Sequence, residues 1–148
     1  DSGADLRAEL TAVVAKAESA LKLRPRLVIE GPVEALVPPD LWLQLLAVLS
    51  EALSNVARHA GAGRVEVRVR ADDDLLLTVT DDGAGIPADV CKGGLRNMRE
   101  RAQARGGTFE ARPAPGGGTV VSWRVPLRAD SRSARHPGRV TGRTGSGG

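Results

Sequence analysis

Apolar residues recur at helical spacing in three segments of this 148-residue chain. The first segment covers residues 5–22, with leucine, valine and alanine side chains on one side. The second runs from residue 41 to about residue 60, with Asp40 as a plausible N-cap and Gly61 as its end. The third covers about residues 94–105. This spacing predicts three helices, each with one buried side.

Strict alternation of apolar and charged residues predicts a strand between the second and third helices. Residues 64–70 alternate valine with arginine or glutamate, and an acidic turn at residues 72–74 leads to residues 75–80, so the pair predicts a hairpin. Further strands are expected at residues 27–29, 108–112 and 119–125. Two prolines in residues 33–39 predict a loop or extended segment rather than a helix. The order predicts an α+β fold, a two-layer α/β sandwich with helices on one face of a mostly antiparallel sheet.

Charge divides the chain into a body and a tail. Five arginines and one aspartate from Arg128 onward contribute +4 to the net charge of +3, so residues 1–127 carry about −1 (+3 minus +4). We therefore expect one domain over residues 1–127, with residues 1–23 as a helix leading in, and a disordered tail at residues 128–148. A body without net positive charge gives no reason to expect a nucleic-acid partner.

A single cysteine, Cys91, excludes an internal disulfide and a zinc site built on several cysteines. Aromatic residues make up only 2% of the chain, so the core must be aliphatic. No apolar run has the length of a membrane span, and the first residues lack the basic-then-apolar pattern of a signal sequence. We therefore expect a cytoplasmic domain without membrane contact.

Four polar residues share one side of the second helix: Glu51, Asn55, Arg58 and His59. They fall within an arc of roughly 100° opposite the apolar side. A solvated helix face would explain them, although asparagine is a poor helix former. Alternatively, the amide oxygen could hold a metal, Glu51 could orient a water, and Arg58 with His59 could bind phosphate. His59 could also accept a phosphoryl group itself, a weaker alternative because it lies at the helix end.

Strand parity separates the adjacent acids Asp81 and Asp82. Asp81 shares its face with Leu77 and Val79, which places a carboxylate at the rim of the core, whereas Asp82 points away or belongs to the turn. A buried carboxylate needs a hydrogen-bond donor. A backbone N–H or Thr119 could supply one, and so could the amino group of a ligand.

The glycines after Asp81 indicate close approach of a ligand. Gly83 and Gly85 permit positive φ, and the helix near Gly94-Leu95 has free N–H groups that suit an anion. The sequence matches neither G-x-x-x-x-G-K-[ST] nor a G-x-G-x-x-G helix start. The segment therefore predicts two subsites, an acid for an amine-bearing base and a helix end for phosphates.

Taken together, these motifs resemble the ATP-binding catalytic domain of histidine kinases, in the GHKL ATPase superfamily. EALSNVARHA at 51–60 resembles its N box and DDGAGI at 81–86 its G1 box. GGLRNMRERAQARGG at 93–107 resembles its second glycine box in sensor kinases of the nitrate-sensor class, and GGGTVVSWRVPL at 116–127 its closing strand. The likeness runs from about Arg26 to Leu127 and looks closest to actinobacterial sensors of hypoxia and dormancy. It implies a Bergerat-type ATP-binding fold.

The resemblance also implies roles for the candidate residues. Asn55 would ligate Mg²⁺ that bridges the ATP phosphates, Glu51 would position or activate the reacting group, and Asp81 would accept a hydrogen bond from the adenine amino group. Thr119 would support Asp81 through water. The remaining ATP-binding positions implied by the resemblance are Arg58, His59, Gly83, Gly85, Ile86, Lys92, Gly93, Gly94 and Leu95.

Two features depart from the family pattern. Lys92 stands where the second glycine box usually has its first glycine, and the lid between Pro87 and Gly93 is very short. No phosphoacceptor histidine of the family type is present, since residues 5–22 contain no histidine. We therefore expect a monomeric domain that binds Mg-ATP and needs a histidine-bearing dimerisation domain of the same full-length kinase, with a response regulator downstream. An anti-sigma-factor-type serine kinase and a degenerate nucleotide-binding module are the alternatives.

Overall fold

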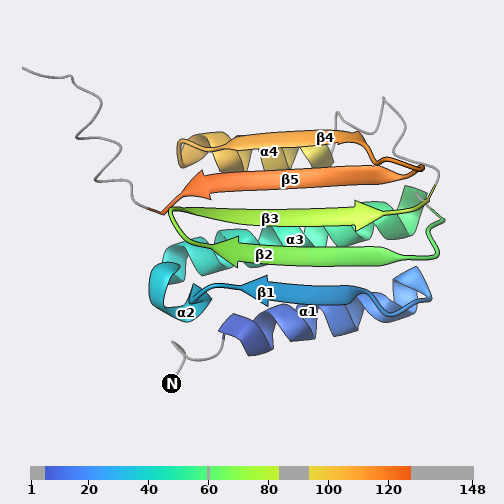
Figure 1. The fold of residues 1–148 in the computed structure, drawn as a ribbon, viewed down its shortest axis with the longest axis horizontal. Coiled ribbons are helices and arrows are strands. Elements are labelled where there is room, and N and C mark those ends of the chain that lie inside the picture. The colour runs from blue at the N-terminus through green and yellow to red at the C-terminus, as the bar shows by residue number, and fades with distance from the viewer. Residues whose placement is uncertain (1–5, 60, 84–93, 128–148) are drawn as a thin grey trace, which may run out of the picture.

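The structure is a computed structural model, and it describes residues 6–59, 61–83 and 94–127. Helices and strands in these ranges form two layers (Figure 1). The helices are α1 (Leu6–Leu21), α2 (Val33–Leu36), α3 (Pro39–His59) and α4 (Gly94–Ala104). The strands are β1 (Arg26–Glu30), β2 (Val65–Ala71), β3 (Asp74–Asp81), β4 (Thr108–Pro113) and β5 (Thr119–Pro126).

The five strands form one sheet in the order β1-β2-β3-β5-β4. β1 pairs with β2 in parallel, and the β2–β3, β3–β5 and β4–β5 pairs are antiparallel. Figure 1 shows α1, α3 and α4 side by side behind one face of this sheet. The predicted α+β sandwich with a mostly antiparallel sheet is confirmed.

The core lies between the helices and the sheet. Every second residue of β3 is buried, which turns Leu75, Leu77 and Val79 toward the helices. The apolar side of α3 meets them through residues such as Leu49 and Leu53. Burying one such side chain stabilises the fold by about 1.5–3 kcal/mol. The predicted apolar faces of the hairpin and of α3 are therefore confirmed.

The segment between β1 and α3 corrects two predictions. Val33–Leu36 forms one helical turn, whereas a loop or extended segment was expected. Pro32 sits at the N-cap, where the missing N–H of proline costs nothing, and Val37 becomes extended before Pro38. The helix α3 begins at Pro39, so Asp40 lies in its first turn and is not the N-cap. The carboxylate of Asp40 instead accepts a hydrogen bond from Arg105 at 2.9 Å.

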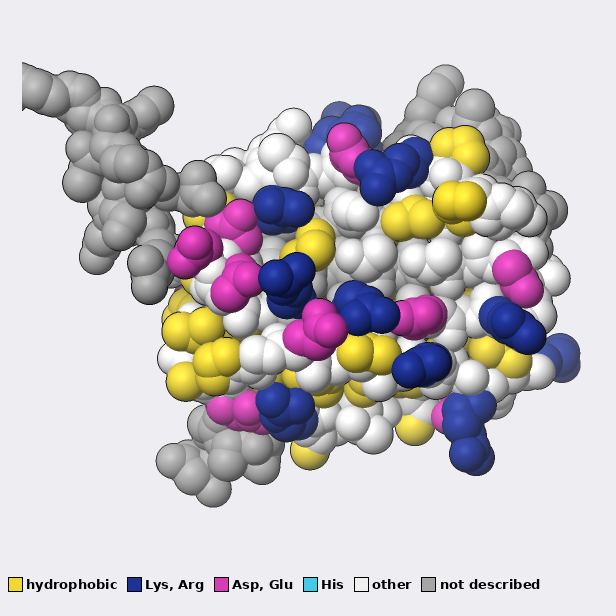
Figure 2. All heavy atoms as spheres, in the orientation of Figure 1, with side chains coloured by type: hydrophobic (Ala, Val, Ile, Leu, Met, Phe, Trp, Pro, Cys, Tyr) yellow, Lys and Arg dark blue, Asp and Glu magenta, His cyan; other side chains and the backbone are white. Residues whose placement is uncertain are grey.

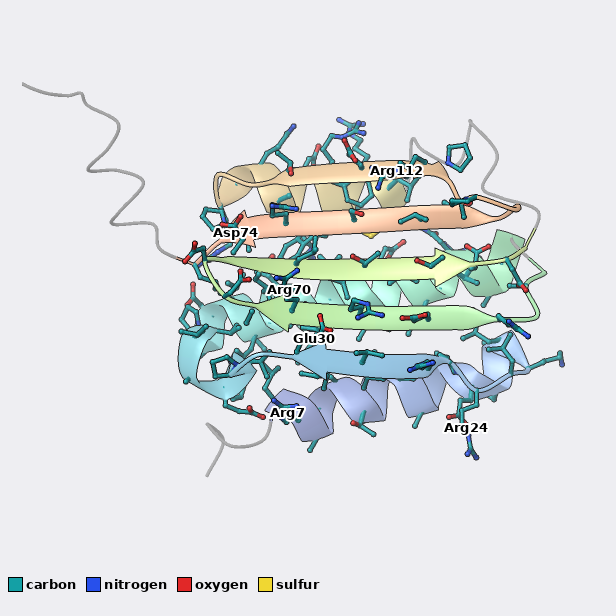
Figure 3. All side chains as sticks on the ribbon, in the orientation of Figure 1. Arg7, Arg24, Glu30, Arg70, Asp74 and Arg112 are labelled. Carbon is teal, nitrogen blue, oxygen red and sulfur yellow. The ribbon has the colours of Figure 1, made fainter. Side chains whose placement is uncertain are left out.

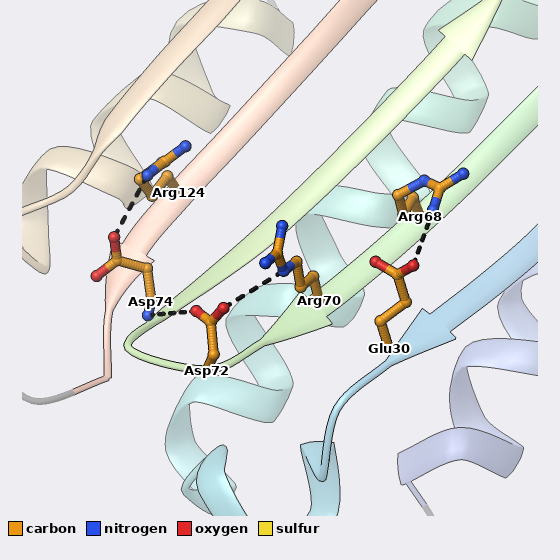
Figure 4. A network of polar contacts seen from close by, with 6 residues as sticks. All are labelled: Glu30, Arg68, Arg70, Asp72, Asp74 and Arg124. Carbon is orange, nitrogen blue, oxygen red and sulfur yellow. Dashed lines mark hydrogen bonds and ion pairs between the residues drawn. The ribbon is translucent and has the colours of Figure 1, made fainter.

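None of the described helices covers the other face of the sheet, and Figure 2 shows charged side chains of both signs along it. Most of these charges form pairs across or along the strands (Figure 4). Arg68 bonds both Glu30 and Glu66, Arg70 pairs with Asp72, and Arg124 pairs with Asp74. Among the described helices, none has the length and apolar character needed to cross a membrane.

Candidate functional site

The candidate residues come together at one end of the sandwich. β3 ends at Asp81, α3 ends at His59 and α4 begins at Gly94, and Figure 1 shows these three ends on the same side of the molecule. The helices α3 and α4 also contact each other directly. The fold therefore gathers motifs that lie far apart in the sequence.

Asp81 is a buried carboxylate at the last position of β3, with 3% of its surface exposed. It lies opposite Thr119, the first residue of β5, which is also buried. Its Oδ1 accepts a hydrogen bond from the backbone N–H of Gly83 at 2.8 Å. A carboxylate has room for several donors, so capacity remains for a further N–H. The predicted orientation of Asp81 and Thr119 toward the core is confirmed.

Burial raises the pKa of Asp81 above its ordinary value. The N–H of Gly83 opposes this shift, the nearby charge of Asp82 adds to it, and the backbone N–H of Thr119 opposes it. Thr119 therefore acts on Asp81 through its backbone N–H. A further N–H donor would stabilise the buried carboxylate, because a hydrogen bond compensates for the hydration lost on burial.

Asp82 is exposed, as parity predicted, but it has a structural role that the sequence reasoning missed. Its Oδ1 accepts hydrogen bonds from the backbone N–H groups of Gly63 and Arg64, both at 2.8 Å. These bonds hold the pKa of Asp82 below its ordinary value, the bond from Arg64 being the main cause. Through these bonds Asp82, which directly follows Asp81, holds the end of β3 against the segment that leads into β2.

Asn55 is the most deeply buried polar side chain of α3, with 1% of its surface exposed. A solvated helix face is therefore the wrong interpretation at this position. Its Oδ1 accepts a hydrogen bond from Nη2 of Arg58 at 2.8 Å. Its Nδ2 is buried without a hydrogen-bond partner in the described part of the chain. Buried amides are rarely left half satisfied, so this one marks a place with unused binding capacity.

The guanidinium of Arg58 connects the polar residues of α3. Besides Asn55, it contacts Oγ of Ser54 and lies 3.9 Å from the carboxylate of Glu51. The side chains of Arg58 and Glu51 are 54% and 35% exposed, so both can reach a ligand at the surface. His59 is the last residue of α3, and its side chain lies outside the described part.

The glycine-rich positions are described only in part. Gly85, Ile86, Lys92 and Gly93 lie outside the described residues, and so does the lid between Pro87 and Gly93. Gly94 is the first residue of α4, as the sequence predicted. The side chain of Leu95 is buried in the core, so only its backbone is available to a ligand.

Gly118 is a site residue that the sequence reasoning did not single out. It has φ +90°, and a Cβ atom placed on it would lie 1.9 Å from the carbonyl oxygen of Asp81. Only glycine fits this close approach between β5 and the end of β3. The run of three glycines before Thr119 is the signal in the sequence that could have identified it.

The arrangement suits a ligand with a neutral amino group at one end and an anion at the other. Asp81 supplies a buried acceptor, Arg58 supplies positive charge, and the beginning of α4 is the positive end of a helix dipole. The oxygen of Asn55 suits a hard divalent cation such as Mg²⁺, which prefers oxygen ligands. That oxygen now accepts the hydrogen bond from Arg58, and the unpartnered Nδ2 is a donor that suits an acceptor such as a phosphate oxygen.

Comparison with known proteins agrees with this arrangement. Residues 42–129 match the family model described as histidine kinase-, DNA gyrase B-, and HSP90-like ATPase. The chain is similar to the sensor protein VraS of Staphylococcus epidermidis, with 35% identity over 102 residues, which are 66% of this chain and 29% of VraS. It thus spans less than a third of that relative.

Two solved structures resemble the fold. A blue-light activated histidine kinase of Erythrobacter litoralis has 27% identity and a TM-score of 0.59, over 84% of this chain and 42% of that chain. The ATP-binding domain of PrrB from Mycobacterium tuberculosis has 23% identity and a TM-score of 0.52, over 79% of this chain and 93% of that one. The second likeness concerns the fold alone.

Proposed function

Because the chain belongs to the family of histidine kinase-, DNA gyrase B- and HSP90-like ATPases, we propose that it is the ATP-binding catalytic domain of a sensor histidine kinase. The observation that carries this proposal is the pair of buried polar groups, Asp81 and Asn55, at the end of the sandwich where α4 begins. One suits the adenine amino group and the other suits the metal that accompanies the phosphates.

ATP would lie with its base toward Asp81 and its phosphates toward Arg58 and the first turn of α4. The glycines and other positions that the resemblance assigns to ATP would complete the pocket: Gly83, Gly85, Ile86, Lys92, Gly93, Gly94, Leu95, His59 and Thr119. Bound Mg²⁺ would supply charge neutralisation of the phosphates. Asn55 would hold it through Oδ1, which would have to leave its hydrogen bond to Arg58.

In the transfer reaction, the bond between the γ-phosphorus of ATP and its bridging oxygen breaks, ADP leaves, and a bond to a histidine nitrogen forms. Glu51 would orient the acceptor imidazole or take its proton, and its partly exposed carboxylate supports that role. The histidine would come from a dimerisation domain of the same full-length protein, and a response regulator would receive the phosphoryl group afterwards. We further propose that this domain lies in the cytoplasm. The sequence GGLRNMRERAQARGG and the short lid sequence support a sensor of the nitrate-sensor class.

Calorimetric titration with ATP, with and without Mg²⁺, tests nucleotide binding. The unmodified chain should bind ATP at or below millimolar concentrations, and Asp81→Ala should weaken binding at least tenfold. Asp72→Ala, which removes an exposed acid at the opposite end of the same hairpin, is the matched control and should bind ATP as the parent does. If Asp81→Ala bound ATP as tightly as the parent, the proposed contact between Asp81 and the adenine amino group would be wrong.

A phosphotransfer assay separates the kinase from the alternative on the same fold. The chain is mixed with radiolabelled ATP and either a histidine-bearing dimerisation domain of a sensor kinase or a serine-bearing anti-sigma antagonist. Label on histidine, stable in base and lost in acid, supports the proposal. Label on serine would replace it with the serine kinase, and ATP binding without transfer to either would favour a degenerate module.

A further inference from the structure

Two hydrogen bonds from different nitrogens hold the guanidinium of Arg58. Nη1 donates to Oγ of Ser54, and Nη2 donates to Oδ1 of Asn55 at 2.8 Å. The carboxylate of Glu51 lies 3.9 Å from Nη2. Because the two bonds use different nitrogens, one can persist when the other breaks. We propose that Ser54 is a positioning residue that keeps Arg58 at the phosphate end of the proposed ATP site.

Helix geometry places Ser54 and Asn55 on either side of Arg58. Ser54 is four residues before Arg58 and Asn55 is three residues before it, and both spacings bring side chains together on one helix surface. At 3.6 residues per turn, the two lie on opposite sides of the direction in which Arg58 points. Asn55 is buried and Ser54 is half-buried, so Arg58 is held from the core side and from the outer side of α3.

The proposed function needs such an anchor, and the inference rests on that function. The metal proposed for the site would take Oδ1 of Asn55, and a guanidinium and a divalent cation repel each other at one oxygen. Nη2 of Arg58 then loses its partner, and a long side chain without a partner regains its rotamer freedom. The bond from Nη1 to Ser54 involves neither the amide nor the metal. It therefore keeps the guanidinium in place while Asn55 changes partner.

The neutral hydroxyl of Ser54 leaves the charge of Arg58 available to a phosphate. Figure 3 shows Arg7 on α1 and Arg112 on β4, on opposite sides of the molecule, and each donates to a carboxylate, at 3.2 Å and 2.6 Å. The two hydrogen bonds of Arg58 go to neutral oxygens, and Glu51 is beyond hydrogen-bond distance. A carboxylate at position 54 would compete with the phosphates for the guanidinium, whereas a hydroxyl orients it without neutralising it.

A purely structural role explains Ser54 less well. Serine is a poorer helix former than alanine, and serine or threonine inside a helix often bonds the carbonyl four residues earlier. Thr11 of α1 does so by donating to the carbonyl of Arg7 at 2.9 Å, whereas Ser54 makes no such bond within the described part of the chain. Replacement of Ser54 by alanine should therefore leave the melting temperature at or above that of the parent, even though binding of the phosphates weakens.

Calorimetric titration with Mg-ATP and with adenosine, which lacks the phosphates, tests the proposal. Ser54→Ala should raise the dissociation constant of Mg-ATP about fivefold, the loss of one hydrogen bond, and change that of adenosine less than about twofold. Ser54→Thr keeps a hydroxyl and should bind Mg-ATP as the parent does. Ser50→Ala, at an exposed serine one turn earlier on α3, is the matched control and should change neither constant. Equal weakening of both ligands by Ser54→Ala would indicate a structural role and overturn the proposal.

A double-mutant cycle tests whether Ser54 acts through Arg58. Arg58→Gln should weaken Mg-ATP binding, and adding Ser54→Ala to it should cause no further loss, because the side chain that Ser54 holds is gone. The same loss in both backgrounds would overturn the proposal. Without nucleotide, the Nη resonances of Arg58 in the NMR spectrum should merge in Ser54→Ala, since the guanidinium rotates more freely, and unchanged resonances would also overturn it.

Failure of this inference and failure of the proposed function give different results. A parent chain that binds no Mg-ATP would remove both together. A parent chain that binds Mg-ATP, with Ser54→Ala binding it equally well, would remove the role of Ser54 alone and leave the proposed kinase function standing.

Discussion

Asn55 and Arg58, one turn apart on α3, share a hydrogen bond of 2.8 Å between the amide oxygen and the guanidinium. The guanidinium also lies 3.9 Å from Glu51. Arg58 therefore occupies the oxygen proposed for the metal and compensates the carboxylate proposed for catalysis. Binding of Mg-ATP would exchange this contact for contacts to the ligand.

The substitution Asn55→Leu should abolish the effect of Mg²⁺ on ATP binding with little change in the free energy of unfolding. Leucine has a similar size and removes a buried amide whose Nδ2 has no partner among the described residues, so the free energy of unfolding should change by less than about 1 kcal/mol. Arg58 is half exposed and can turn to water. The enhancement of ATP binding by Mg²⁺ should disappear. Thermal melts and calorimetry in both metal conditions check this.

Asn97→Leu, on the exposed side of α4, is the control for Asn55→Leu and should retain the magnesium effect. If Asn55→Leu kept the full magnesium dependence of ATP binding, the metal assignment would be wrong.

Asp81 should make the protein more stable as the pH falls from neutral. Its folded pKa is raised above 3.8, so the folded protein binds the proton more tightly than the unfolded chain. The penalty for its ionisation is fully present above the folded pKa and is lost as the pH falls through that pKa toward 3.8. Urea unfolding between pH 7 and pH 4 should show this rise in the parent, and Asp81→Asn should reduce it.

Asp82 should have the opposite effect on acid stability. Its folded pKa is lowered, so its contribution is present above 3.8 and is lost as the pH falls through the folded pKa. Asp82→Asn keeps an oxygen acceptor but not the charge, so it should weaken the tie to Gly63 and Arg64 and flatten the loss of stability below about pH 4. Unfolding midpoints from pH 5 to pH 2 measure this. A curve identical to that of the parent would contradict the assigned role.

Gly118→Ala should destabilise the chain more than Gly116→Ala. Both glycines have positive φ, but a Cβ on Gly116 meets nothing within 4 Å, whereas one on Gly118 lies 1.9 Å from the carbonyl oxygen of Asp81. The first substitution should cost about 1 kcal/mol and the second about 2–4 kcal/mol. Gly118→Ala should also weaken ATP binding, because it displaces the strand end that carries Asp81. Denaturant unfolding and calorimetry on both variants check the difference.

Local pattern was enough for most of the elements. The structure confirmed the predicted alternation in β2 and β3 and the apolar side of α3. Each of these elements buries one face, so its apolar residues recur with the period of a strand or a helix. The turn at Val33–Leu36 was missed because the prolines around it rule out only a longer helix. The N-cap was wrongly assigned to Asp40, because the start of a helix depends on which backbone carbonyl accepts its first hydrogen bond. Here that carbonyl belongs to Pro38, so the helix begins at Pro39.

The candidate site was likewise predicted from the sequence only in part. Asp81 and Thr119 could be assigned to the buried face from parity alone, because the side-chain period of a strand is two. The burial of Asn55, the clash that reserves position 118 for glycine, and the two backbone bonds of Asp82 depended on neighbours far away in the sequence. By itself the sequence determined which apolar residues face inward along the strands and along α3. Only the tertiary structure decided which polar groups meet, because side-chain distances are set by how β3 packs against α3 and β5.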